Sequence, residues 1–195
     1  MSKNSKFEIT NIKISDMTQG KYIQPKEFLF SQNGFNKRWE VLEVHDSVAI
    51  LLYEKVRETF ILVKQFRPAV YLSNNDGLTY ELCAGIVDKN LTIKEIAKEE
   101  IIEECGYDVP LENIHEVTSF FNAVGFASGV QTLFYAEVDD SLKTENGGGV
   151  DDEVIEVVEV PLKEINDFIF DVSKAKTPGL MFAINWFIEN KLNKK

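Results

Sequence analysis

The sequence predicts a mixed α/β sandwich, with N-terminal strands that form either a separate small sheet or a dimer arm. Apolar segments typical of strands lie on both sides of one amphipathic helix, which begins near residue 93. Two further helices are expected after the last strand, one from Pro161 and one from Pro178. This order of elements suggests the mixed sandwich.

The N-terminal part of the chain is expected to form strands and one hairpin. Residues 7–14 and 27–31 alternate between polar and apolar side chains. Asn33-Gly34, a pair typical of hairpin turns, leads into residues 37–44. These strands carry many aromatic side chains for a short element: Tyr22, Phe28, Phe30 and Phe35.

The rest of the chain supplies the sheet and the central helix. Apolar segments predict its strands: 47–53, 59–66, 79–83, 115–121, 130–138 and 154–160. Residues 67–77 are expected to form a loop. Thr92, with Glu95 three residues later, has the pattern of a capping box that starts the helix, and Gly106 is a typical glycine just beyond the last turn.

Length and composition limit the class of protein. At 195 residues, the chain suits one domain with a small addition. We therefore divide it into an N-terminal β-strand arm, residues 1–44, which is a candidate dimerisation element, and a main domain, residues 45–195. The net charge of −11 argues against nucleic-acid polymers and anionic membranes as partners. Two cysteines, no signal sequence and no membrane-spanning apolar run predict a cytoplasmic location.

The central helix carries an unusual cluster of glutamates in the stretch KEEIIEECGY, residues 98–107. At about 100° per residue, Glu100, Glu103 and Glu104 share an arc with the apolar residues Ile93, Ile96, Ala97 and Ile101. Glu99 and Cys105 fall on the opposite side. Unpaired carboxylates on a core-facing arc are costly to desolvate, unless the helix borders a cleft that holds a cation. Carboxylate oxygens suit hard ions, so we predict a site for Mg²⁺, or Mn²⁺ in its place.

Residues 85–107 resemble the Nudix box, G-x5-E-x7-R-E-U-x-E-E-x-G-U, without a gap. Two positions depart from the pattern: Leu91 replaces the first glutamate, and Glu99 replaces the arginine, which in the family orients a glutamate of the metal site. The segments HDSVAILLY, ILVKQFRPAVY, YELCAGIVD and QTLFYAEV extend the likeness to the UDP-sugar diphosphatase and ADP-ribose pyrophosphatase branch of that superfamily.

The resemblance implies a fold, a reaction and an assembly. The fold would be a Nudix-type α/β/α sandwich with a mixed central sheet. The reaction would be Mg²⁺-dependent hydrolysis of the pyrophosphate bond of nucleoside diphosphate sugars, of UDP-glucose or ADP-ribose type, to a nucleoside monophosphate and a sugar phosphate. The assembly would be a homodimer with exchanged N-terminal strands.

The resemblance also assigns roles around the metal ion. Glu100, Glu104 and the backbone carbonyl of Ala84 are the expected metal ligands. Glu103 is an expected catalytic residue, as a further ligand or as the support of one. After the glycine-rich loop, Glu153 is expected to bind metal or water, and Asp151 is the candidate general base; the alternative for this segment is a flexible acidic surface loop.

Three further residues are candidates for substrate binding. Arg67, at the end of a predicted strand, suits a bidentate phosphate contact, although it also fits a simple surface arginine. Glu81 is expected to contact the metal or the phosphates, and Trp39 to stack on the base. The two departures from the box leave another function open, a nucleotide-sugar sensor that binds without cleaving.

Overall fold

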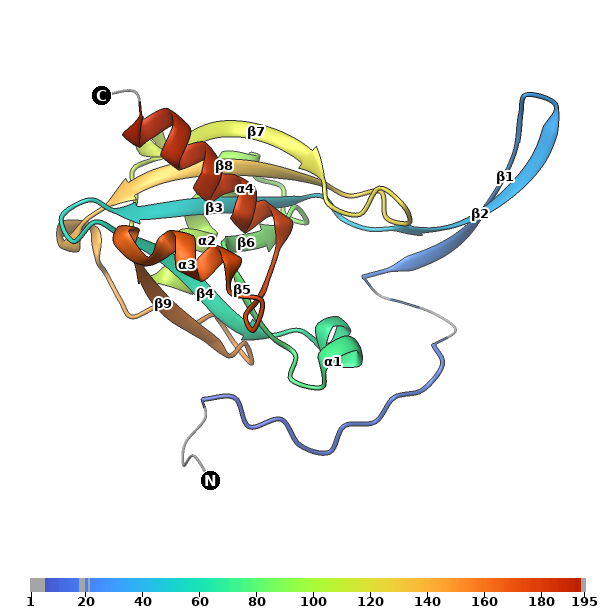
Figure 1. Ribbon diagram of the computed structural model, residues 1–195, viewed down its shortest axis with the longest axis horizontal. Coiled ribbons are helices and arrows are strands. Elements are labelled where there is room, and N and C mark those ends of the chain that lie inside the picture. The colour runs from blue at the N-terminus through green and yellow to red at the C-terminus, as the bar shows by residue number, and fades with distance from the viewer. Residues whose placement is uncertain (1–5, 18–19, 21, 194–195) are drawn as a thin grey trace.

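The computed structural model describes residues 6–17, 20 and 22–193. It contains a curled mixed sheet between helices, and a hairpin that extends away from this body (Figure 1). The α/β/α sandwich predicted from the sequence is confirmed. Among the described residues, no helix is both long and apolar enough to cross a membrane.

The main sheet has the strand order β10-β5-β4-β3-β8-β7, with β6 also paired to β3 and β9 to β4. Its strands are β3 (Ser47–Glu54), β4 (Thr59–Phe66), β5 (Leu78–Glu81), β6 (Cys83–Ile86), β7 (His115–Phe121), β8 (Val130–Val138), β9 (Ile155–Pro161) and β10 (Ala175–Lys176). The helices are α1 (Pro68–Asn74), α2 (Ile93–Glu100), α3 (Ile165–Phe170) and α4 (Pro178–Phe187). Single π-helical turns continue two of them, Ile101–Cys105 after α2 and Ile188–Leu192 after α4.

The two faces of the sheet bury separate apolar clusters. Alternate residues of β3 point to opposite faces, so Ile50 packs with α2 while Leu51 packs with α3 and α4. In the α2 segment, the fully buried apolar residues are Ile96, Ala97, Ile101 and Cys105. Helix α2 is thus held on one face by its apolar stripe, which sets the orientation of its glutamates.

The strand expected at 79–83 is in fact two short strands with different neighbours. β5 pairs with β4, where Glu81 lies opposite Val63, whereas β6 pairs with β3, where Cys83 lies opposite Ile50. Leu82, between them, points into the core on the α3–α4 side. The change of partner therefore brings β6 next to α2.

Helix α2 begins as predicted and ends differently. Thr92 and Glu95 form the capping box, and Gly106 ends the helix in the left-handed conformation, with φ of 75°. The placement of Cys105 on the exposed side is wrong, because the last turn is π-helical and its extra residue per turn rotates the positions after Ile101. Ile93, expected on the buried arc, is 37% exposed in the first turn.

The N-terminal arm contains the expected hairpin. β1 (Gln24–Gln32) pairs antiparallel with β2 (Phe35–Glu43), and the turn residues Asn33 and Gly34 have φ of 54° and 82°. The strand predicted at 7–14 is wrong: this segment pairs with no described strand, and its apolar side chains border hollows beside Phe66 and α1 instead. The loop predicted at 67–77 contains α1, which begins with a proline and ends at Asn75 in the left-handed conformation.

Candidate active site

Two glutamates of the α2 segment have buried or half-buried carboxylates. Glu104 is 4% exposed, and one of its oxygens accepts a hydrogen bond from the backbone N–H of Ala84 at 2.9 Å. Burial raises the pKa of Glu104 to about 8, and the charge of Glu100 adds to the effect. Burial and the charge of Glu103 raise the pKa of Glu100 to about 7. Carboxylates in this situation favour either a proton or a bound cation.

Strand β6 passes directly beneath these carboxylates because position 85 has no side chain. A Cβ atom built on Gly85 would overlap the carboxylate of Glu100. The next residue back, Ala84, is the one that holds Glu104 through its backbone. The backbone of β6 and two carboxylates of α2 therefore border the same small space.

The glycine-rich loop is fastened to the end of the α2 segment. The N–H of Gly148 donates to the carbonyl of Glu104 at 2.9 Å, and the N–H of Gly149 donates to the carbonyl of Glu103 at 3.1 Å. All three glycines of the loop have positive φ: Gly147 66°, Gly148 118° and Gly149 88°. A Cβ atom on Gly147 would overlap the backbone of Glu104. The glycines therefore permit both the turn of the loop and its close contact with the end of the helix.

This docking brings one of the two predicted acidic residues to the glutamates. The charge of Glu153 contributes to the raised pKa of both Glu100 and Glu104. Its carboxylate accepts a hydrogen bond from the N–H of Val150 at 3.2 Å, which helps to hold it in place. Asp151 is exposed, with φ of 52°, and makes no hydrogen bond or ion pair within the described part of the chain.

Arg67 and Glu81 form a two-point ion pair beside the glutamates. Nε and Nη2 of Arg67 donate to the two oxygens of Glu81 at 2.8 and 2.7 Å. The hydroxyl of Thr79 donates to Glu81 as well. The hydrogen bond to Glu81 is the largest cause of the raised pKa of Arg67, and the charges of Glu104 and Glu153 raise this pKa further. Arg67 therefore borders the acidic group with a fixed orientation.

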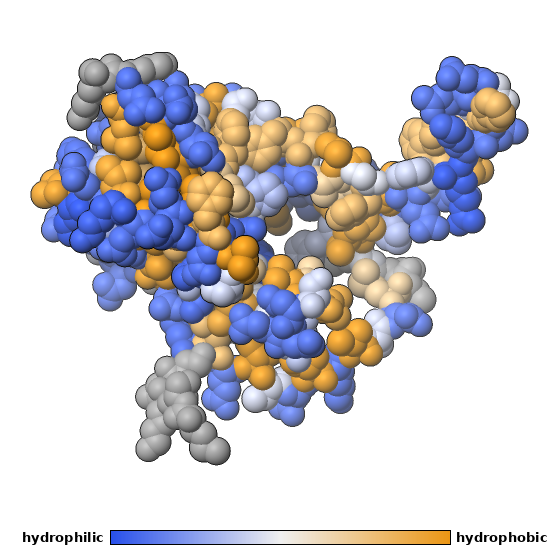
Figure 2. All heavy atoms as spheres, viewed as in Figure 1, coloured by the Kyte–Doolittle hydropathy of each residue, from blue (hydrophilic) through white to orange (hydrophobic). Residues whose placement is uncertain are grey.

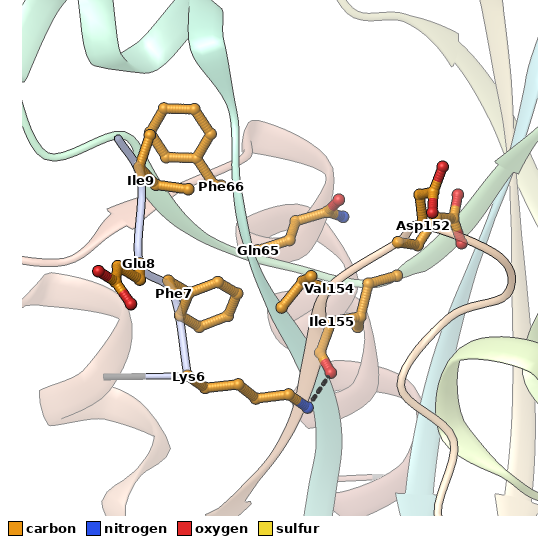
Figure 3. Close-up of a pocket in the computed structure, with 10 residues that line it drawn as sticks. Lys6, Phe7, Glu8, Ile9, Gln65, Phe66, Asp152, Val154 and Ile155 are labelled. Carbon is orange, nitrogen blue, oxygen red and sulfur yellow. Dashed lines mark hydrogen bonds between the residues drawn. The ribbon is translucent and has the colours of Figure 1, made fainter. Parts of the chain in front are cut away.

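A cavity of about 440 Å³ lies beside the acidic loop (Figure 3). Asp152, Glu153 and the end of β4 form one side of it, and the N-terminal residues 6–9 form the other. The ammonium group of Lys6 donates a hydrogen bond to the backbone carbonyl of Ile155 (Figure 3). No sequence signal indicated that the N-terminal segment would lie here.

Trp39 lies on the arm, at a distance in sequence and topology from the glutamates. Its indole N–H donates to the carbonyl of Gly125 at 2.7 Å, and its side chain is 55% exposed. Leu42 forms two further backbone hydrogen bonds with the same loop, to Phe126 and Ser128. Trp39 is thus held by the loop before β8 and remains about half exposed.

Comparison with known proteins decides the family. No protein-family model matches the chain. The uridine diphosphate glucose pyrophosphatase NUDT14 of Bos taurus is 36% identical over 208 residues, which cover 92% of this chain and 94% of that protein. The protein of the same name from Mus musculus is 36% identical over 195 residues, which cover 85% of this chain and 88% of that protein. A GDP-mannose pyrophosphatase of Pectobacterium atrosepticum is 39% identical over 64% of each chain.

The chain belongs to the Nudix hydrolases. The family expected from residues 85–107 is thereby confirmed. In this Nudix hydrolase, the box departs from the pattern at two positions with different surroundings. Leu91 is 40% exposed, and Glu99 forms an ion pair with Lys89, Nζ to Oε2 2.7 Å.

The donor set of this Nudix hydrolase fits a hard divalent cation. Glu100, Glu104 and the carbonyl of Ala84 offer oxygen atoms only, and neither carboxylate forms an ion pair with any described residue. Within residues 6–17, 20 and 22–193, no three acidic, histidine or cysteine side chains are arranged to enclose an ion, and Glu104 is bound to the Ala84 amide instead. One oxygen of Glu104 accepts this hydrogen bond, which leaves the other oxygen for an ion.

Sequence reasoning missed three parts of the site. The hydrogen bonds from Gly148 and Gly149 to the helix end were not expected, although three consecutive glycines after the box were a visible signal. The N-terminal wall of the cavity carries no such signal. Lys89 was also missed, and the replacement of the box arginine by an acid pointed to a nearby base.

Proposed function

We propose that this Nudix hydrolase cleaves the pyrophosphate bond of nucleoside diphosphate sugars in the presence of Mg²⁺, releasing a nucleoside monophosphate and a sugar phosphate. The observation that carries the proposal is the pair of carboxylates of Glu100 and Glu104 at the backbone of Ala84 and Gly85. Both have a raised pKa, because both are desolvated beside other acids. Such a pair is costly to keep in the folded protein unless it serves to bind a cation.

Each residue of the site has its own role in the proposed reaction. Glu100, Glu104 and the carbonyl of Ala84 would hold Mg²⁺, with Glu103 beside them as support. When bound, the ion neutralises charge on the pyrophosphate and makes a bound water more acidic. We assign Glu153 the role of base ahead of Asp151, because the charge of Glu153 acts on Glu100 and Glu104, whereas Asp151 is exposed. Within the described part of the chain, the Arg67 side chain donates only to Glu81, which fixes its orientation and leaves Nη1 for a phosphate oxygen.

For the substrate we favour UDP-glucose and related nucleotide sugars. The support is the identity with proteins named for UDP-glucose and for GDP-mannose over most of this chain. Trp39 provides an accessible aromatic surface for the base. ADP-ribose is the competing substrate, because no described residue distinguishes uracil from adenine by its hydrogen bonds.

Product analysis tests the proposal. Purified protein is incubated with Mg²⁺ and, separately, with UDP-glucose, GDP-mannose, ADP-glucose and ADP-ribose, and the products are separated by chromatography. We expect nucleoside monophosphate from UDP-glucose at the highest rate, and loss of at least a hundredfold in Glu104→Gln. Glu112→Gln, an exposed glutamate outside the site, is the matched control. Binding of all four without any product would contradict hydrolysis and favour the sensor.

We also propose that the protein is a homodimer in the cytoplasm. The hairpin β1–β2 extends away from the main body (Figure 1) and carries large exposed apolar side chains: Phe28, Leu29 and Phe35 are between 58% and 72% exposed (Figure 2). A second copy would cover this surface. Light scattering tests the assembly, with Phe28→Ser/Phe35→Ser expected to give monomer; a monomeric wild type would overturn it. Cell fractionation tests the location.

A further inference from the structure

The loop between β6 and α2 is linked to the helix by an ion pair. Lys89 Nζ lies 2.7 Å from Glu99 Oε2, and the two side chains are 44% and 40% exposed. The ends of the loop are held separately. The N–H of Val87 donates to the carbonyl of Asp46 at 2.8 Å, and the capping box at Thr92 begins the helix. The ion pair therefore connects the middle of the loop to the last turn before Glu100.

The charges of this pair are opposite in sign to those of the family pattern. The Nudix box places an acid in the loop, where this chain has Leu91, and an arginine on the helix, where it has Glu99. Here the base lies in the loop and the acid lies on the helix. Both departures from the box are explained together if Lys89 supplies the positive charge from the loop side.

Lys89 also lies close to the glutamates of the site. After the Glu99 hydrogen bond, the charges of Glu103 and Glu100 contribute to its raised pKa. In return, the ammonium group opposes the repulsion between Glu100 and its acidic neighbours. A half-exposed ion pair contributes little to global stability, so its main effect should be local.

We propose that Lys89, paired with Glu99, is a positioning residue that replaces the missing box arginine. The pair fixes the loop against α2 and thereby keeps the Ala84–Gly85 backbone and the carboxylates of Glu100 and Glu103 in their relative positions. This inference rests on the proposed hydrolase function. It concerns orientation, because an ammonium group repels a metal cation and cannot itself improve its binding.

The test uses four variants of the full chain. Lys89→Met and Glu99→Gln each break the pair, the double variant removes both partners, and Lys89→Glu/Glu99→Lys restores the pair with the signs of the family pattern. Lys55→Met, which breaks the distant ion pair with Asp139 (2.9 Å), is the control. The readouts are kcat and KM, Mn²⁺ binding by electron paramagnetic resonance, melting temperature, and hydrogen exchange of residues 87–92 without substrate.

We expect kcat to fall about tenfold in each single variant, with KM and melting temperature nearly unchanged. The double variant should be no worse than either single one, and the exchanged pair should recover most of the activity. Lys89→Met should bind Mn²⁺ at least as tightly as the wild type, and amide protection in the loop should fall in the single variants and return in the exchanged pair.

Several outcomes would overturn the proposal. Additive losses, or no recovery in the exchanged pair, would show that the two side chains act independently. A rise in KM alone for Lys89→Met would mean that Lys89 contacts substrate. An equal loss in Lys55→Met would show a nonspecific charge effect. If the wild type cleaves no nucleotide sugar, the proposed function fails, while hydrogen exchange still tests the loop–helix link by itself.

Discussion

Arg67 and Glu81 hold each other by two parallel hydrogen bonds, Nε to Oε1 at 2.8 Å and Nη2 to Oε2 at 2.7 Å. Glu81 is 6% exposed, and this arginine and the Thr79 hydroxyl supply hydrogen bonds to its buried carboxylate. An arginine expected to bind phosphate is therefore already engaged, with its geometry set before any substrate arrives. Preorganisation of this kind lowers the cost of binding a phosphate group.

Glu81→Gln should reduce both stability and substrate affinity. The variant keeps the shape but loses one charge-assisted pair, which should cost about 1–3 kcal/mol in the free energy of unfolding. KM should rise about tenfold, because Arg67 is then free to rotate. Urea denaturation and steady-state kinetics measure the two effects. In Arg67→Met/Glu81→Gln the two losses should fail to add, whereas full additivity would mean that the pair is not coupled.

Gly85→Ala should abolish most of the activity without unfolding the protein. The new Cβ atom would overlap the carboxylate of Glu100, which must then move by about 1 Å, and a displacement of that size costs roughly a hundredfold in kcat. Circular dichroism should remain unchanged.

The matched control for this substitution is Gly125→Ala, because nothing lies within 4 Å of a Cβ atom at that position and its φ is not positive. A similar loss of activity in both variants would contradict a specific role for the space beside Glu100.

The acidic site was largely predictable because its pattern is local. The capping box, the apolar stripe and the glycine stop all depend on residues within one helix, and they placed Glu104 on the buried side correctly, with Glu100 half-buried. The π-helical turn was not predictable from a spacing of about 100° per residue, and it moved Cys105 into the core.

Contacts between segments that are distant in the sequence could not be predicted. Nothing in the segment 79–83 shows that its strand changes partner at Leu82, since pairing depends on the edges that β3 and β4 leave open. The alternation of residues 7–14 resembles a strand, but a strand needs a neighbour to satisfy its backbone groups. The docking of Gly148 and Gly149 on the helix end likewise depends on tertiary structure.

Gly147→Ala should detach the acidic loop from the helix. Its φ of 66° is strained for alanine, and the Cβ atom would overlap the backbone of Glu104. We expect a loss of about 2 kcal/mol in the free energy of unfolding and a fall in kcat, because Glu153 is displaced with the loop.

Gly34→Ala is the control that separates backbone strain from the overlap with the helix. That glycine has φ of 82° in the hairpin turn, with nothing within 4 Å of a Cβ atom, so it reports backbone strain alone. Equal destabilisation and an equal fall in kcat in both variants would show that contact with the helix is unimportant.

The stability of the metal-free protein should fall as the pH rises. The pKa of Glu100 is about 7 and that of Glu104 about 8 in the folded protein, both above the ordinary value of 4.5. The folded state therefore binds these protons more tightly than the unfolded chain, and this stabilisation is present near pH 4.5 and lost as the pH approaches 8. With EDTA present, we expect the melting temperature to drop by roughly 5 °C between pH 5.5 and pH 8.

A bound cation should reverse this trend, because it stabilises the ionised carboxylates that repel each other without it. Scanning calorimetry at the two pH values, with EDTA or with Mn²⁺, measures both effects. Glu104→Gln should flatten the pH dependence without metal and remove most of the gain from Mn²⁺. A wild type that is stabilised by rising pH in EDTA, or that gains nothing from Mn²⁺ at pH 8, would contradict the assignment of these two glutamates as the cation site.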